Sequence, residues 1–203
     1  MKSLSEIETT VKRATKAAGF SWGVSEDVGK CVKVLELFGL PGIKNLNQYY
    51  KDRNIKKFEC LHIINEKNFS TSGPYCPIIL GINFLDQIKT IKQSKKIYFK
   101  SIGYPIIFLS FLSRASEIIG KKIYIKIDNI EFLLNYNINI LSNFFNQNQL
   151  SDGKNVEIEI LDNQDNFSDI EWKELYKLSE NTFVEETESL KQGGAGAGLT
   201  DND

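Results

Sequence analysis

The residues best placed to do chemistry surround Cys76, in the segment Ser72-Gly73-Pro74-Tyr75-Cys76-Pro77. Proline is favoured at the first position of a helix, so Pro77 predicts a helix start with Cys76 at its N-cap. The unpaired backbone N–H groups and the positive end of the helix dipole would lower the pKa of this thiol and favour a nucleophilic thiolate. The alternative interpretation is that Cys76 is a small buried hydrophobic side chain at a turn.

His62 is the only histidine of the chain. From a predicted strand nearby it could act as the base for Cys76, and a histidine packed or hydrogen-bonded in the core is the alternative. Because the chain has a single histidine, metal-binding motifs that need two histidine ligands are excluded. The cysteines, Cys31, Cys60 and Cys76, are odd in number and widely spaced without a CxxC pair, which predicts neither a disulfide framework nor a zinc cluster. We therefore expect reduced thiols and no metal site, and no cofactor is indicated.

A second candidate site is the segment from Gly19 to Asp27. Functionally, Trp22 could form the wall of a pocket while Glu26 supplies a carboxylate for acid–base catalysis. Structurally, Trp22 could pack between two helices and Glu26 could complement a helix dipole. Both interpretations place this segment at the junction of two helices.

Charge is divided unevenly along the 203 residues. Residues 1–150 hold 21 basic and 12 acidic side chains (+9), and residues 151–203 hold 4 basic and 14 acidic ones (−10). This asymmetry indicates anion handling, self-docking or a partner. The Gly/Ala-rich end of the chain could deliver Thr200, Asp201 and Asp203 to a basic site. Candidate cations for that site are Arg13, Lys16, Arg53, Lys95, Lys96 and Arg114.

The elements that must position these residues can be read from periodicity and capping residues. Helices are predicted at 4–18, at 26–38 with Ser25 as the cap, at 41–49, 78–91, 105–119 and 168–178. Short strands are predicted at 60–64, 97–99, 123–127 and 156–160, with a polar loop at 65–73. Residues 129–149 lack a single period, and we expect a strand followed by a helix there.

These elements predict an α+β fold in which a helical N-terminal unit, residues 1–52, packs on a mixed sheet with flanking helices. We expect a single domain over residues 1–184 and an extended, acidic, Gly/Ala-rich tail over residues 185–203. The composition, 41% hydrophobic and 25% charged, is that of a globular body.

Several function classes are disfavoured. No apolar run approaches the length of a membrane span, and the charged N-terminus does not resemble a signal peptide, so we expect a cytoplasmic protein that does not enter a membrane. A near-neutral total charge and the lack of a known module motif argue against nucleic-acid binding.

Three segments together resemble a bacterial family of roughly 200-residue proteins of unknown function. They are GxxWGxxE at residues 19–26, GPxCP at residues 73–77 with Gly81, and GAGAGLTDND at residues 194–203. The resemblance implies a cytoplasmic bacterial protein and transfers no activity. It sets the three segments side by side as candidates for one site.

The leading hypothesis is an enzyme, or an enzyme subunit, that acts on a small anionic metabolite. Its catalytic candidates are Cys76, His62 and Glu26, and its ligand-binding candidates are Trp22, Arg13, Arg114, Thr200, Asp201 and Asp203. Two alternatives stay open: an accessory protein whose acidic tail docks on a basic surface of this chain, of a protein partner or of a second copy, and a sensor that binds a small ligand.

Overall fold

A computed structural model describes residues 2–144 and 150–183. The chain divides into two compact units, Met1–Asn163 and Gln164–Asp203. The second unit contains helix α6 (Asp169–Ser179) and the short 3-10 helix η1 (Glu180–Thr182). Helix α6 belongs to the second unit, and the single domain over residues 1–184 stays a prediction. The predicted tail, with Thr200, Asp201 and Asp203, lies outside the described residues.

The chain begins with three helices, α1 (Leu4–Ala17), α2 (Trp22–Leu37) and α3 (Gly42–Arg53), as the periodicity predicts. The prediction that Ser25 caps α2 is wrong. The cap is Ser21, whose hydroxyl accepts a hydrogen bond from the N–H of Val24 at 3.3 Å. Ser25 lies inside the helix, where its hydroxyl donates to the carbonyl of Ser21 at 2.7 Å. Two serines four residues apart offered the same capping signal, and the upstream one caps the helix.

Six strands form one mixed sheet, which confirms the α+β class. The strands are β1 (Lys67–Phe69), β2 (Lys96–Gly103), β3 (Ile123–Ile127), β4 (Ile130–Asn135), β5 (Asn139–Ser142) and β6 (Asp152–Ile160). Their order is β1-β2-β6-β3-β4-β5, and only β1 and β2 run parallel. Ile158 of β6 pairs with Ile97 on one side and Ile125 on the other, so buried side chains line up on one face.

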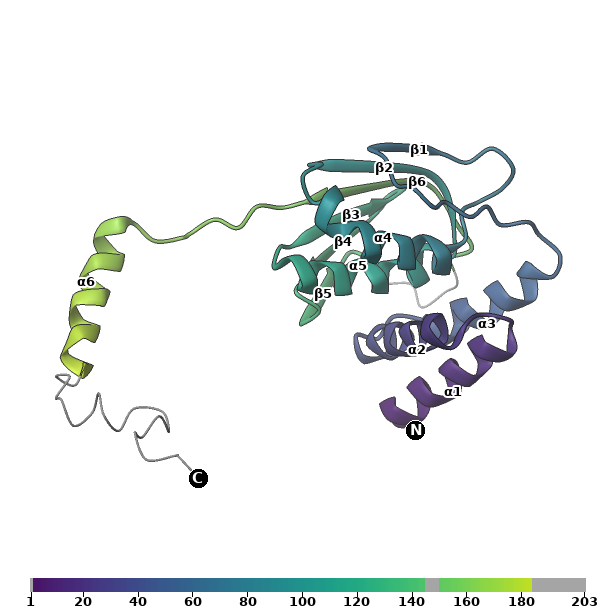
Figure 1. The fold of residues 1–203 in the computed structure, drawn as a ribbon, viewed down its shortest axis with the longest axis horizontal. Coiled ribbons are helices and arrows are strands. Elements are labelled where there is room, and N and C mark those ends of the chain that lie inside the picture. Colours follow the sequence, from purple (N-terminus) through teal and green to yellow (C-terminus); the bar gives the residue numbers. More distant parts are fainter. Residues whose placement is uncertain (1, 145–149, 184–203) are drawn as a thin grey trace, which may run out of the picture. The chain divides into compact units, whose positions relative to one another are not determined.

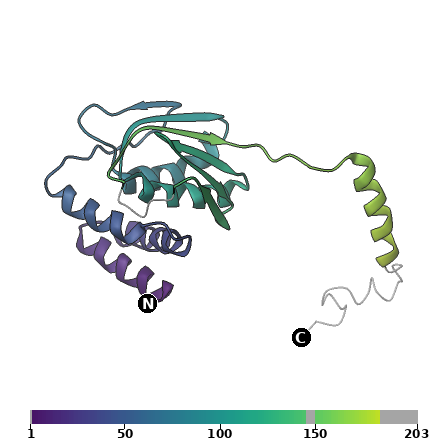
Figure 2. The ribbon, with the colours of Figure 1, turned by 180° about the vertical axis from the view of Figure 1, so that it is seen from behind.

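Helices α4 (Pro77–Ile91) and α5 (Pro105–Ile119) lie between the sheet and the three N-terminal helices (Figures 1 and 2). Every residue of α5 from Pro105 to Ser113 is buried, as expected for a helix enclosed on all sides. Gly81 of α4 allows close packing against α5, since a Cβ atom there would lie 2.3 Å from the ring of Phe111. The N-terminal helices therefore reach the sheet chiefly through α4 and α5.

Two sequence predictions fail between α3 and α4 and a third fails after β4. Residues 60–64 form no strand, because only Glu59 pairs there, in an isolated parallel bridge to Tyr75. Strand β1 instead lies in the predicted loop, where Asn68 hydrogen-bonds to the carbonyl of Tyr98 at 3.1 Å. In the described part of residues 129–149, β4 confirms the predicted strand, and β5, which pairs with β4 in a hairpin, lies where a helix was predicted.

Candidate functional site

The first two of the three segments that the sequence set side by side meet at a groove of about 610 Å³. The groove lies at the N-terminal ends of α2 and α4, beside the end of α3. We call it the basic groove, and its lining residues are Gly19, Phe20, Ser21, Val24, Tyr49, Arg53, Lys56, Lys57, Phe58, Cys60, Cys76 and Ile79. Two helix N-termini at one groove bring together backbone N–H groups and the positive ends of two helix dipoles, an arrangement that favours anions.

The turn between α1 and α2 supplies one wall of the basic groove. Gly19 has a φ of 94°, a left-handed conformation that favours glycine after the end of α1. The next residue, Phe20, is buried, and its ring carries the guanidinium of Arg53 at 4.3 Å from the ring centroid. The Nη1 atom of Arg53 also donates to the carbonyl of Ala18 at 2.8 Å. These contacts fix the cation at the groove.

The loop before α4 supplies the other wall and is held by backbone pairing. Tyr75 bridges in parallel to Glu59 on one side and to Ile102 on the other. The N–H of Cys76 donates to the carbonyl of Glu59 at 2.8 Å. Gly73 lets the chain pass close to its neighbour, because a Cβ atom there would lie 2.5 Å from the carbonyl oxygen of Lys57. The glycine of the GPxCP segment is thus required for this loop to reach the groove.

Cys76 caps α4 and Pro77 is the first helical residue, as predicted. The thiol is buried, with its Sγ atom 3.0 Å from the hydroxyl of Tyr49. Burial raises the pKa of Cys76 and outweighs the opposing effect of the N–H groups of Ile79 and Ile78 and of the Tyr49 hydroxyl. Burial likewise raises the pKa of Tyr49. At neutral pH the pair is therefore a thiol and a phenol, which supports the interpretation of Cys76 as a buried side chain.

Three cations lie along the basic groove, two of them in the segment that follows α3. Lys56 pairs with Asp52 at 2.6 Å, and this carboxylate also accepts from the hydroxyl of Tyr104 at 2.8 Å. Lys57 lies next to it and forms no ion pair within the described part of the chain. Among the described residues no carboxylate lines the groove. The groove therefore presents positive charge against the aromatic rings of Phe20, Tyr49 and Phe58.

The remaining catalytic candidates lie elsewhere. His62 is exposed, and its backbone carbonyl accepts a hydrogen bond from Gln87 at 2.8 Å. Glu26 bridges Lys30 at 2.9 Å and Lys12 at 3.1 Å. Hydrogen bonds from Lys30 and Lys12 lower the pKa of Glu26 to about 2. The structure thus does not bring His62 or Glu26 to Cys76.

The ligand-binding candidates are also dispersed. Trp22 is 57% exposed and carries the Lys16 ammonium 5.6 Å from its ring centroid. Arg13 is exposed on α1, and Arg114 of α5 pairs with Asp27 of α2. None of these three lines the basic groove. Arg53, one of the scattered basic candidates, is the cation that the fold places there.

Four residues that line the groove were not predicted from the sequence: Tyr49, Lys56, Lys57 and Phe58. A usable signal was present, since Arg53, Lys56 and Lys57 follow one another at spacings of three and one just after a predicted helix. Three cations and an aromatic residue within six positions indicate a local basic patch. The spacing could not show that the turn between α1 and α2 lies opposite these cations in the groove.

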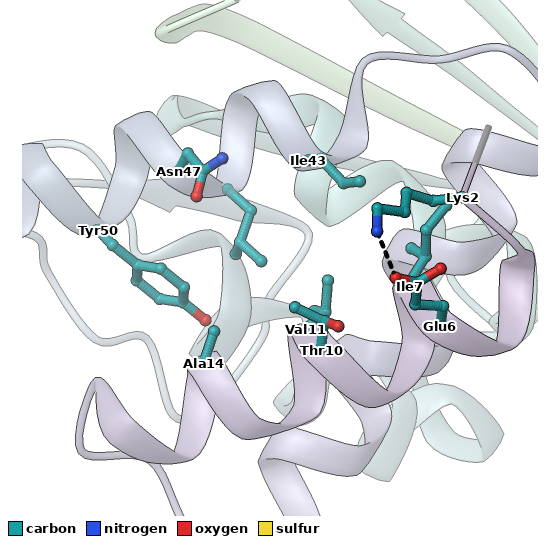
Figure 3. Close-up of a pocket in the computed structure, with 10 residues that line it drawn as sticks. Lys2, Glu6, Ile7, Thr10, Val11, Ala14, Ile43, Asn47 and Tyr50 are labelled. Carbon is teal, nitrogen blue, oxygen red and sulfur yellow. Dashed lines mark hydrogen bonds and ion pairs between the residues drawn. The ribbon is translucent and has the colours of Figure 1, made fainter.

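A second groove lies between α1 and α3 and has a volume of about 390 Å³ (Figure 3). We call it the apolar groove, and its lining residues are Lys2, Glu6, Ile7, Thr10, Val11, Ala14, Ile43, Leu46, Asn47 and Tyr50. Its two charged residues, Lys2 and Glu6, pair with each other at 2.6 Å. No group of three or more potential metal-ligating side chains occurs among the described residues.

A known protein family matches part of the chain. Residues 2–78 match the family model described as Protein of unknown function (DUF3726). This agrees with the predicted resemblance to a family of unknown function. The matched range spans α1 to α3 and nearly the whole basic groove, which extends past it only at Ile79. No curated protein and no solved structure matches the chain. In the part of the chain that the structure describes, every helix is too short or too polar to cross a membrane.

Proposed function

We propose that the protein binds a small anionic molecule with a planar or aromatic part in the basic groove. The observation that carries the proposal is the convergence of Arg53, Lys56 and Lys57 on a groove without a carboxylate. The N-terminal ends of α2 and α4 add the positive ends of two helix dipoles, and Phe20 and Phe58 supply apolar surface. A carboxylate or a phosphate monoester attached to a ring fits this combination.

Binding is better supported than catalysis by Cys76. The thiol is buried against Tyr49, burial raises its pKa, and among the described residues no histidine or carboxylate lines the groove beside it. An enzyme of this kind would need an activated nucleophile or a general base at the ligand. Among the hypotheses drawn from the sequence, we therefore favour the ligand-binding sensor. The location of the protein in a bacterial cytoplasm stays a prediction.

A thermal-shift screen followed by calorimetry tests the proposal. We expect ring-bearing carboxylates and phosphate monoesters to raise the melting temperature of the full chain, and neutral analogues of the same shape to leave it unchanged. Binding should weaken as salt concentration rises, since the groove is open to solvent.

The matched variants are Arg53→Gln and Lys51→Gln. Both residues are exposed cations of α3, and only Arg53 lines the basic groove. Loss of a charge-assisted hydrogen bond should weaken the best ligand by about tenfold or more in Arg53→Gln. Lys51→Gln should stay within about twofold of the natural chain, and equal weakening in both variants would contradict the proposal.

A second function, association with another protein chain, is favoured by α6. This helix exposes Trp172, Leu175 and Tyr176, and Phe167 stacks on Trp172 with ring centroids 5.5 Å apart. Clustered exposed aromatic and aliphatic side chains on a helix are typical of helices that dock on a partner. Sedimentation of the full chain and of Leu175→Glu tests this role, since a self-associating chain should become monomeric in the variant.

A further inference from the structure

Two of the three cysteines come together at the basic groove although they are 16 positions apart in the sequence. The parallel bridge between Glu59 and Tyr75 sets this juxtaposition. The N–H of Glu59 donates to the carbonyl of Pro74 at 3.0 Å, and the N–H of Cys76 donates to the carbonyl of Glu59 at 2.8 Å. Cys60 and Cys76 follow immediately, one residue further along each chain segment.

This register suits a covalent link between the two residues. Paired strands lie roughly 4.8 Å apart, within the range of roughly 4.4–6.8 Å found between the Cα atoms of disulfide-bonded cysteines. The backbone of Cys76 is still extended, with φ −63° and ψ 116°, and each cysteine is one residue from the bridged pair of Glu59 and Tyr75. Side chains alternate along an extended segment, which turns Cys60 and Cys76 to the side opposite Glu59 and Tyr75. Both cysteines accordingly line the same groove.

The two thiols differ in their access to solvent. Cys60 is exposed, whereas Cys76 is 4% exposed and contacts the hydroxyl of Tyr49. An exposed thiol beside a second thiol is the arrangement of a redox-responsive cysteine and its resolving partner. Cys31 is buried on α2 and is not among the residues that line the basic groove.

We propose that Cys60 and Cys76 form a reversible intramolecular disulfide when the protein meets a peroxide. The exposed Cys60 thiol reacts first: its sulfur is oxidised to the sulfenic acid while hydrogen peroxide is reduced to water. The Cys76 sulfur then attacks the Cys60 sulfur, the S–O bond breaks, and the hydroxyl leaves with the Cys76 proton as a second water. A dithiol reductant reverses the step and is itself oxidised to its disulfide.

The disulfide would join the segment after α3 to the first turn of α4 across the lining of the basic groove. It would also remove the thiol proton of Cys76, so that only the Tyr49 hydroxyl could donate in the contact between the two side chains. The link itself does not depend on the identity of a ligand, so its formation can be tested without one.

Peptide mapping of the full chain tests the proposal. The purified reduced protein is treated with hydrogen peroxide, remaining thiols are blocked, and trypsin releases residues 58–67 with Cys60 and residues 68–89 with Cys76. We expect these two peptides to appear as one linked species, lighter by two hydrogen atoms than their sum, and a dithiol to separate them again.

Three variants fix the assignment. Cys60→Ser and Cys76→Ser should each abolish the linked species, and Cys31→Ser should leave it unchanged. Because Cys60 is exposed, Cys60→Ser keeps the test decisive even if Cys76→Ser does not fold. The proposal would be overturned by a Cys60 that ends as sulfinic acid or as a link between two chains, by a link to Cys31, or by cysteines that remain reduced.

Discussion

The basic groove and the apolar groove share helix α3, yet they present opposite surfaces. The apolar groove lies along the sides of α1 and α3, where side chains such as Ile7, Val11 and Leu46 meet. Its only charges, Lys2 and Glu6, neutralise each other. The basic groove lies at helix ends, where backbone N–H groups lack partners within the helix. Among the described residues no carboxylate lines it, although Asp52 pairs with Lys56 from outside the lining. Helix sides thus supply apolar surface, and helix ends supply the unbalanced polarity that can recognise an anion.

The largest effect is expected from a substitution at Gly81, which sets how close α4 lies to α5. In Gly81→Ala the new Cβ atom would meet the Phe111 ring, so we expect a loss of about 3 kcal/mol in unfolding free energy. Denaturant unfolding measures this loss.

The matched control is Gly23→Ala, in the first turn of α2, where a Cβ atom meets nothing within 4 Å. We expect its stability to change by less than about 0.5 kcal/mol or to rise slightly. A Gly81→Ala chain as stable as the Gly23→Ala chain would show that α4 can shift, and that the basic groove is not held as described.

Alkylation separates the exposed thiol of the basic groove from the buried ones. Iodoacetamide at pH 8 should modify Cys60 about 100-fold faster than Cys76 or Cys31. Burial raises the pKa of Cys76, and it raises the pKa of Cys31 to about 12. Rates come from peptide masses over time. A Cys76 that reacts as fast as Cys60 would restore the thiolate hypothesis.

Asp52 pairs with Lys56 of the basic groove, and this carboxyl should make the fold sensitive to acid. Hydrogen bonds from Lys56, Tyr104 and Gln48 lower the pKa of this buried carboxyl. A lowered pKa stabilises the fold above the unfolded-state pKa, and the contribution is lost as pH falls through the folded-state value.

The variant Asp52→Asn should therefore be about 2 kcal/mol less stable than the natural chain at pH 7. The difference should shrink as pH is lowered toward 3. Unfolding curves recorded across this range check the trend, and a difference that grows on acidification would have the wrong sign for this account.

The smallest effect is expected in the apolar groove. Glu6→Gln removes the exposed ion pair with Lys2, which should change stability by less than about 0.5 kcal/mol. The same variant should leave anion binding unchanged within the error of calorimetry. Weaker anion binding in Glu6→Gln would remove the distinction between the two grooves.

Most of the fold could be predicted from the sequence, but only part of the site could. Helix periodicity and proline at a first helical position located α4, α5 and the Cys76 cap, because these are local signals. Strand β1 was missed because parallel pairing with β2, and not an apolar pattern of its own, defines it. Likewise the meeting of Phe20 with Arg53, and of Cys60 with Cys76, depends on contacts between distant segments that no spacing records.

Nuclear magnetic resonance of the uniformly ¹⁵N-labelled full chain, titrated with phenyl phosphate and in parallel with benzyl alcohol, tests the central claim most directly. Phenyl phosphate carries the ring and the anion, and benzyl alcohol is a neutral control of similar shape. The account predicts that phenyl phosphate alone shifts the backbone amides of residues 20–24, 53–60, 76, 78 and 79, which border the basic groove. Shifts confined to α1 and the first turns of α3, equal shifts with both compounds, or no shifts at all would contradict it.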